Sequence, residues 1–195
     1  ILRKNRHSIA ILDGNESKQD LINLGKDVFY YFGMGCRSVS KLLVPNDYDF
    51  DLLFNAFYEH KEIINHNRYA NNYDYNKAIY LMSEQKFIEN GFIMLKEDQK
   101  LGSPISCLFY EKYNSNNDIN EYINNNKDII QCVVSNFLTK NSIPFGSSQS
   151  PKIENFADNI DTLNFLLKIW WYLIQNLFKI IYDLINLQLF KIKYD

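Results

Sequence analysis

Short apolar runs alternate with stretches of helical periodicity in the first part of the chain. Residues 7–12 (HSIAIL) form an apolar run that ends at the turn signal of residues 13–15. Val39–Val44 is a second apolar run, rich in β-branched residues and ended by Pro45. Between them, residues 16–34 place apolar side chains on one face of a helix. The pattern predicts strand, helix and strand, an order that favours a right-handed parallel crossover.

Beyond Pro45 the same alternation continues. A helix is predicted over 49–58, and strands are predicted over 91–95, 104–110 and 129–135. Several strands separated by helical stretches predict an α/β fold with a mostly parallel sheet flanked by helices. Three segments are different: 66–75 is too irregular to assign, 114–126 is Asn-rich and predicts a surface loop leading into a short helix, and 143–151 predicts a loop.

The C-terminal part predicts a long hydrophobic helix. Lys168, Lys179 and Asp183 interrupt it, which leaves about ten uncharged residues in a row where a bilayer span needs roughly 20. We therefore expect no transmembrane segment. The pattern favours packing against a core or a partner, with a position on a membrane surface as the alternative. The apolar stripe consists of Leu163, Leu167, Trp170, Ile174, Leu177, Ile181 and Leu184.

Composition narrows the possible functions. The 195 residues include 21 Lys and Arg against 23 Asp and Glu, a net charge of −2, and 46% are hydrophobic. This hydrophobic content excludes a disordered tail, and the lack of basic excess argues against a duplex nucleic-acid partner. Three cysteines, far apart, argue against a disulfide scaffold or a zinc module. The histidines have no metal-binding spacing, so we expect no metal site. The odd number of widely spaced cysteines indicates a reducing, intracellular compartment, and we expect a cytoplasmic protein.

Cys36 is the strongest candidate for chemistry. It follows Gly35 and precedes Arg37 in a loop between a predicted helix and a predicted strand. A thiolate in such a loop attacks carbonyl carbon readily, and a nearby guanidinium favours the thiolate. The alternative is an inert buried cysteine, which is the interpretation we give to Cys107 and Cys132 in their apolar runs.

Four long blocks stand out along the chain. They are YFGMGCRSVSKLLVP at 31–45, INHNRYANNYDYNKAIYL at 64–81, LKEDQKLGSPISCLFYE at 95–111 and PFGSSQSPKIENFADNIDTLNFLL at 144–167. In this order they resemble the blocks of bacterial fatty acyl-CoA reductases of the luminescence type, a branch of the aldehyde dehydrogenase superfamily. The resemblance covers nearly all of residues 5–167.

The resemblance implies a fold and a reaction. Residues 1–168 would form an aldehyde dehydrogenase-like catalytic domain, and 169–195 would be an atypical apolar helical tail without a family counterpart. The reaction would be the NADPH-dependent reduction of a long-chain fatty acyl-CoA to a fatty aldehyde through a thioester on Cys36. Gly35, Arg37, Phe145 and Gly146 would lie at the substrate pocket. The alternative for the last two is a turn that holds the final helix.

The resemblance also implies where the cofactor binds. In the family, NADPH is bound mainly by an N-terminal domain that precedes the segment matching Ile1, so this chain would be a catalytic half that is inactive alone. Glu97 is the candidate cofactor contact, although its spacing to Ser103-Pro104 departs from the family motif. The expected partners are fatty acyl-CoA and a second copy in a homo-oligomer. Oxidation of a long-chain aldehyde, an inactive fragment and an interaction module remain as alternatives.

Overall fold

The computed structural model describes residues 5–137, 142–156 and 160–194, with side chains described as far as residue 182. The chain forms two compact units, Ile1–Lys152 and Ile153–Asp195. Ala157 and Asp158, from the last of the four blocks, lie outside the described residues. The domain boundary predicted between 168 and 169 falls inside the helix of the second unit.

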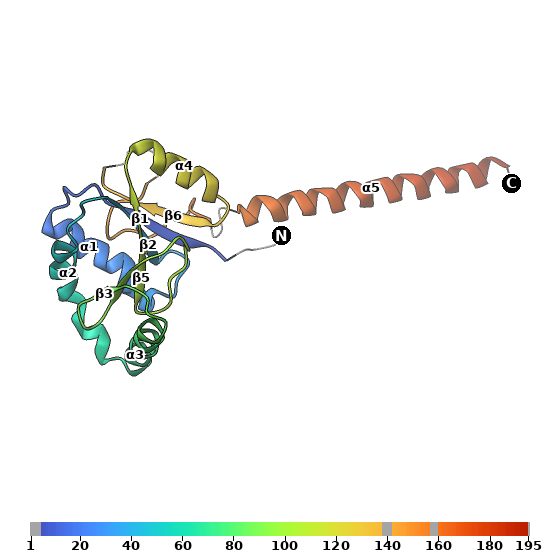
Figure 1. The fold of residues 1–195 in the computed structure, drawn as a ribbon. Coiled ribbons are helices and arrows are strands. Elements are labelled where there is room, and N and C mark those ends of the chain that lie inside the picture. The colour runs from blue at the N-terminus through green and yellow to red at the C-terminus, as the bar shows by residue number, and fades with distance from the viewer. Residues whose placement is uncertain (1–4, 138–141, 157–159, 195) are drawn as a thin grey trace. The chain divides into compact units, whose positions relative to one another are not determined.

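The first unit is built on one six-stranded sheet of order β3-β4-β5-β2-β1-β6 (Figure 1). All neighbouring strands are parallel except the antiparallel pair β3 and β4. The predicted α/β fold with a mostly parallel sheet is therefore confirmed. The strands are β1 (His7–Ile11), β2 (Val39–Pro45), β3 (Ile88–Glu89), β4 (Met94–Glu97), β5 (Cys107–Tyr113) and β6 (Ile130–Val134).

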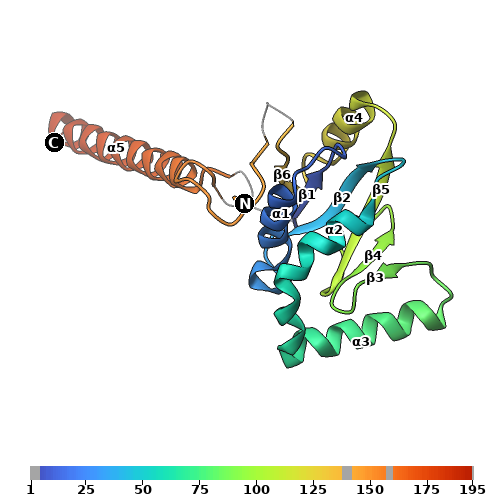
Figure 2. The same ribbon diagram turned by 90° about the vertical axis from the view of Figure 1, so that its left-hand side faces the viewer.

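Helices cover both faces of this sheet (Figure 2). The main core lies under α1 and α2, whose Leu24 and Phe57 are fully buried against strand residues such as Leu42. The opposite face packs under α4 through Ile119. The helices of this unit are α1 (Lys18–Phe29), η1 (Tyr30–Gly33), α2 (Phe50–Phe57), η2 (Tyr58–Asn65), α3 (Asn67–Met82) and α4 (Asn116–Asn126), where η marks a 3-10 helix.

Helix α1 begins as its sequence dictates but ends earlier than predicted. Ser17 caps the first turn, and its side chain and that of Asp20 satisfy each other's backbone N–H groups. The prediction of a helix to Met34 is wrong because the α-helix stops at Phe29. Tyr31 and Phe32 adopt left-handed backbone angles with φ of 56° and 58°, which an α-helix cannot continue through. The short turn η1 leads from there into the Cys36 loop.

Other departures concern α3 and two strands. Most of the segment 66–75, which has no recognisable helix pattern, lies in α3, which begins at Asn67. This helix buries Tyr69, Tyr73 and the polar Asn76, so its inner face is not the aliphatic stripe that periodicity detects. Strands β4 and β5 each begin three residues later than predicted, at Met94 and Cys107.

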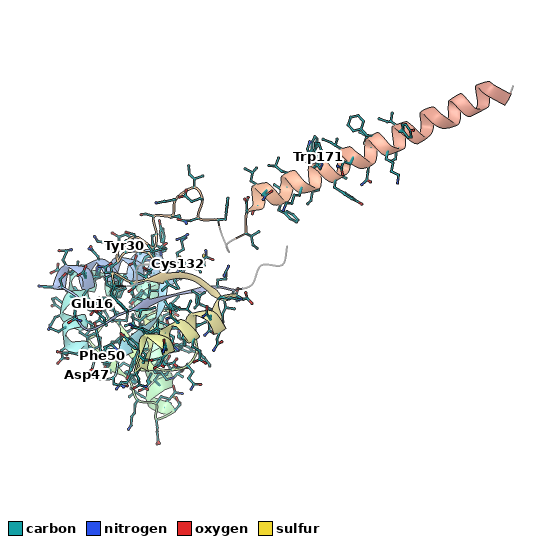
Figure 3. All side chains as sticks on the ribbon, turned by 90° about the horizontal axis from the view of Figure 1, so that it is seen from above. Glu16, Tyr30, Asp47, Phe50, Cys132 and Trp171 are labelled. Atoms are coloured by element: carbon teal, nitrogen blue, oxygen red, sulfur yellow. The ribbon has the colours of Figure 1, made fainter. Side chains whose placement is uncertain are left out.

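The second unit contains helix α5 (Thr162–Tyr194). Side chains such as Trp171 project from it (Figure 3). Among the described residues, no helix combines the length and apolar character needed to cross a membrane. The exposed apolar side chains of α5 are Leu163, Phe165, Leu166, Leu167, Ile169, Trp170, Trp171, Tyr172, Leu173, Leu177, Phe178, Ile180, Ile181 and Tyr182.

Candidate active site around Cys36

Cys36 lies in an exposed turn that connects η1 to the central strand β2. Two tight turns shape this connection: Met34 N donates to Tyr31 O at 3.1 Å, and Ser38 N donates to Gly35 O at 2.9 Å. The Cys36 side chain is exposed, whereas the other two cysteines are buried, as predicted for them. A nucleophile needs this accessibility, because the substrate carbonyl must reach the sulfur.

The backbone of Cys36 is held on one side and available on the other. Its carbonyl accepts a hydrogen bond of 2.9 Å from the hydroxyl of Ser8, which is fully buried on β1. In the part of the chain that the structure describes, the Cys36 N–H donates to no protein acceptor. A fixed peptide group with an available N–H is suited to stabilise negative charge that develops next to the thiol.

Arg37 contacts a different cysteine. One guanidinium nitrogen lies 3.1 Å from Cys132 Sγ and 3.1 Å from the carbonyl oxygen of Ser148. Burial raises the pKa of the Cys132 thiol, and the positive charge of Arg37 opposes that rise. Arg37 therefore links the Cys36 turn to β6 and to the loop after it, because its hydrogen bonds reach both.

The loop that contains Phe145 and Gly146 is anchored on α1. The fully buried Asp27 carboxylate accepts N–H bonds from Gly146 at 2.6 Å and from Ser148 at 2.9 Å. Burial raises the pKa of Asp27, against the lowering effect of these donors. Phe145 belongs to the main core, and Gly146 has φ +82°, a conformation that favours glycine. Both residues therefore serve the packing of the loop in this structure.

Ser38 joins these parts. Its Oγ accepts N–H bonds of 3.2 Å from Gly35 N and from Gln149 Nε2, and lies 3.5 Å from the carbonyl oxygen of Tyr30. A Cβ added at Gly35 would stand only 3.2 Å from Ser38 Oγ, so glycine suits this close approach. Ser38 is thus hydrogen-bonded to the Cys36 turn, to the loop that contains Gln149 and to η1.

The structure does not bring Glu97 to this site. Glu97 is exposed at the carboxyl end of β4, and Cys36 precedes the amino end of β2. Because β4, β5 and β2 are parallel, these two ends lie at opposite edges of the sheet.

Sequence reasoning found Cys36 and its neighbours but missed the residues that position them. Ser8, Asp27 and Gln149 are ordinary polar residues without a motif. Only Asp27 gives a signal, since it stands three residues after Leu24 and therefore shares the apolar face of the predicted helix. Among the described residues, no group of three or more His, Cys, Asp or Glu side chains is arranged to hold a metal ion.

Comparison with known proteins adds no relative. No family model matches this chain. A search of curated proteins likewise finds no match. The resemblance of the four sequence blocks therefore stays a prediction.

Proposed function

We propose that this chain carries the acyl-transfer centre of a fatty acyl-CoA reductase, with Cys36 as its nucleophile. The observation that carries the proposal is an exposed thiol in a tight turn, next to its own N–H, which donates to no acceptor among the described residues. The four family-like blocks support the same assignment, because Cys36 stands at the family's nucleophile position within the first of them.

The proposed step is a thioester exchange. The Cys36 thiol loses its proton to solvent, and the thiolate attacks the carbonyl carbon of the acyl-CoA to form a new C–S bond. Negative charge develops on the carbonyl oxygen, where the Cys36 N–H donates a hydrogen bond. The bond to the CoA sulfur then breaks, and CoA leaves as a thiolate that takes up a proton. The products are acyl-Cys36 and free CoA.

The surrounding hydrogen bonds hold the nucleophile in place. Ser8 fixes the Cys36 carbonyl, and Ser38 fixes the turn against Gln149. Holding reacting groups in one geometry lowers the entropic part of the barrier, and this is what these partners contribute.

NADPH, which the resemblance implies as the hydride donor, does not fit the described residues. At the amino end of α1, Glu16 Oε1 accepts the backbone N–H groups of Asp13 and Gly14, the donors that a dinucleotide phosphate would need. Glu97 lies at the opposite sheet edge from Cys36. We therefore propose the acyl-transfer step for this chain and derive no reduction step from its residues.

Covalent labelling tests the proposal. The full chain is incubated with an acyl-CoA labelled in its acyl group and analysed by peptide mass spectrometry, with hydroxylamine to confirm a thioester. We expect label on Cys36, its loss in Cys36→Ala and its retention in Cys107→Ala. Labelling that survives in Cys36→Ala, or no labelling of the folded wild-type chain, would refute the assignment.

A further inference from the structure

An apolar pocket lies directly before the Cys36 turn. It has a volume of about 460 Å³ and is lined by the four aromatic residues 29–32 together with His60 and Ile63 of η2. Tyr30 and Tyr31 of this lining, and Met34 shortly after it, are exposed. Tyr30 is labelled in Figure 3. A preformed apolar pocket beside a reactive group is typical of a ligand site.

The pocket walls are fixed by aromatic packing. Phe29 stacks on His60 with ring centroids 5.2 Å apart, and Phe32 stacks on His66 at 4.3 Å. His60 Nε2 lies 3.1 Å from the carbonyl oxygen of Ile22, so this ring nitrogen is engaged outside the pocket. His60 is the one titratable group of the lining besides the tyrosine hydroxyls. The lining therefore suits an uncharged, apolar group.

The backbone of this wall is strained. Tyr31 and Phe32 both hold left-handed φ angles, which are rare for bulky aromatic residues and cost free energy. Strain of this kind gathers at functional sites, where surrounding structure enforces it. Glycine at either position would avoid it, yet both positions present aromatic rings to the pocket lining.

The pocket lies close to the nucleophile along the chain. Phe32 and Cys36 are four residues apart, which is at most about 14 Å of extended chain. The two tight turns shorten this distance, and Ser38 Oγ lies 3.5 Å from the carbonyl oxygen of Tyr30. A saturated chain attached to Cys36 Sγ is long enough to bridge this separation.

We infer that this pocket binds the acyl chain of the thioester and sets the chain length that Cys36 accepts. The inference rests on the proposed function and names residues 29–32, His60 and Ile63 as its specificity determinants. The lining holds no Lys or Arg side chain for a charged phosphate or carboxylate, whereas its aromatic and aliphatic side chains suit a methylene chain.

A chain-length series is the first test. The rate of Cys36 labelling is measured with acyl-CoAs from butanoyl to hexadecanoyl, and we expect an increase of up to about fourfold for each methylene that the pocket buries. Ile63→Trp fills the pocket and should abolish the increase for long chains while labelling by butanoyl-CoA is kept. The matched control is Ile79→Trp on the exposed side of α3, outside the lining, which should leave the series unchanged.

A second variant tests the inference even if Ile63→Trp does not fold. Tyr31→Gly removes an aromatic wall and relieves the left-handed strain, so it is expected to fold at least as well as wild type. It should flatten the chain-length dependence. A labelling rate independent of chain length in wild type, or an equal loss for short and long chains in Ile63→Trp, would overturn the inference.

Photolabelling separates this inference from the proposed function. A free fatty acid carrying a diazirine needs no reaction at Cys36, and we expect its cross-links within residues 29–32 and 60–63. Helix α5, with its exposed apolar side chains, is the other apolar surface of the chain that competes with the pocket for the fatty acid. Cross-links confined to α5 overturn the inference. An Ile63→Trp variant that differs from wild type only in oligomeric state, with the chain-length series unchanged, also overturns it. Pocket cross-links without Cys36 acylation would refute acyl transfer and leave the pocket assigned.

Discussion

At the scale of single residues, the three cysteines share a chemistry but not an environment. Cys36 is exposed, whereas Cys107 and Cys132 are buried and burial raises the pKa of both thiols. We expect brief treatment of the native chain with iodoacetamide to alkylate Cys36 alone, because the reagent needs an accessible thiolate. Peptide mass spectrometry reads the sites, and the urea-unfolded chain, which should react at all three, is the control. Equal rates at Cys36 and Cys107 in the native chain would contradict the structure.

Cys107 should also make stability depend on alkaline pH. Burial raises the pKa of its thiol from 9.0 to about 11, so the folded state prefers the protonated form. Its contribution is fully present below pH 9 and is lost as the pH rises towards 11. Between about pH 8 and about pH 11 this amounts to about 2 kcal/mol of unfolding free energy. The measurement is urea unfolding of wild type and Cys107→Ala at both pH values.

The comparison with Cys107→Ala cancels the titration of buried tyrosines that do not interact with this thiol, such as Tyr122. Burial and, after it, the Cys107 thiol raise the pKa of Tyr69 and Tyr80, so the response of these two tyrosines belongs to the same buried cluster. The stability difference between wild type and variant should shrink at high pH. A difference that stays constant from neutral to alkaline pH would show that Cys107 titrates normally in the folded chain.

At the scale of elements, the packing of α1 against η2 depends on a missing side chain. Gly25 lies in the interior of α1, and a Cβ at this position would overlap the ring of His60. Alanine is favoured over glycine in a helix interior by about 1 kcal/mol, but forced repacking costs about 1–3 kcal/mol. We therefore expect Gly25→Ala to lower the free energy of unfolding, measured by chemical denaturation.

A double-mutant cycle checks the cause. In a His60→Ala background the overlap is gone, so Gly25→Ala should be neutral or stabilising there. If Gly25→Ala destabilises equally in both backgrounds, the close approach to His60 is not the reason.

Periodicity was sufficient for elements with aliphatic faces and failed where other forces decide. It located β1, β2 and α2 to within a few residues. It missed α3, whose inner face is aromatic and polar. It also extended α1 through Tyr31, because left-handed angles at a tyrosine leave no mark in the sequence.

The candidate site shows the same division. Cys36 stands out through local features, its glycine neighbour and its loop. Its partners do not, since Ser8 is 28 positions away and Gln149 lies 111 positions from Ser38. Such contacts depend on how strands are ordered in the sheet, which no local pattern encodes.

At the scale of the whole chain, the two compact units differ in how far their apolar side chains are buried. The buried clusters described here all lie within the first unit. In the second unit, Leu166, Trp170 and Phe178 are among many exposed apolar side chains of α5. A net charge of −2 provides little repulsion between copies. Exposed apolar surface of this extent promotes association, so we expect the full chain to self-associate.

Truncation after Lys152 should separate folding from association. The shortened chain keeps the sheet and its buried clusters, so it should unfold cooperatively and elute as a monomer in size-exclusion chromatography with light scattering. The full chain should elute as larger species, and its double variant Leu166→Lys, Trp170→Lys should shift towards monomer, because both side chains are exposed and the substitutions add charge. A full chain that is already monomeric would contradict association through α5. A truncated chain that associates as strongly as the full one would place the adhesive surface within the first unit, where the apolar pocket beside Cys36 offers the next surface to test.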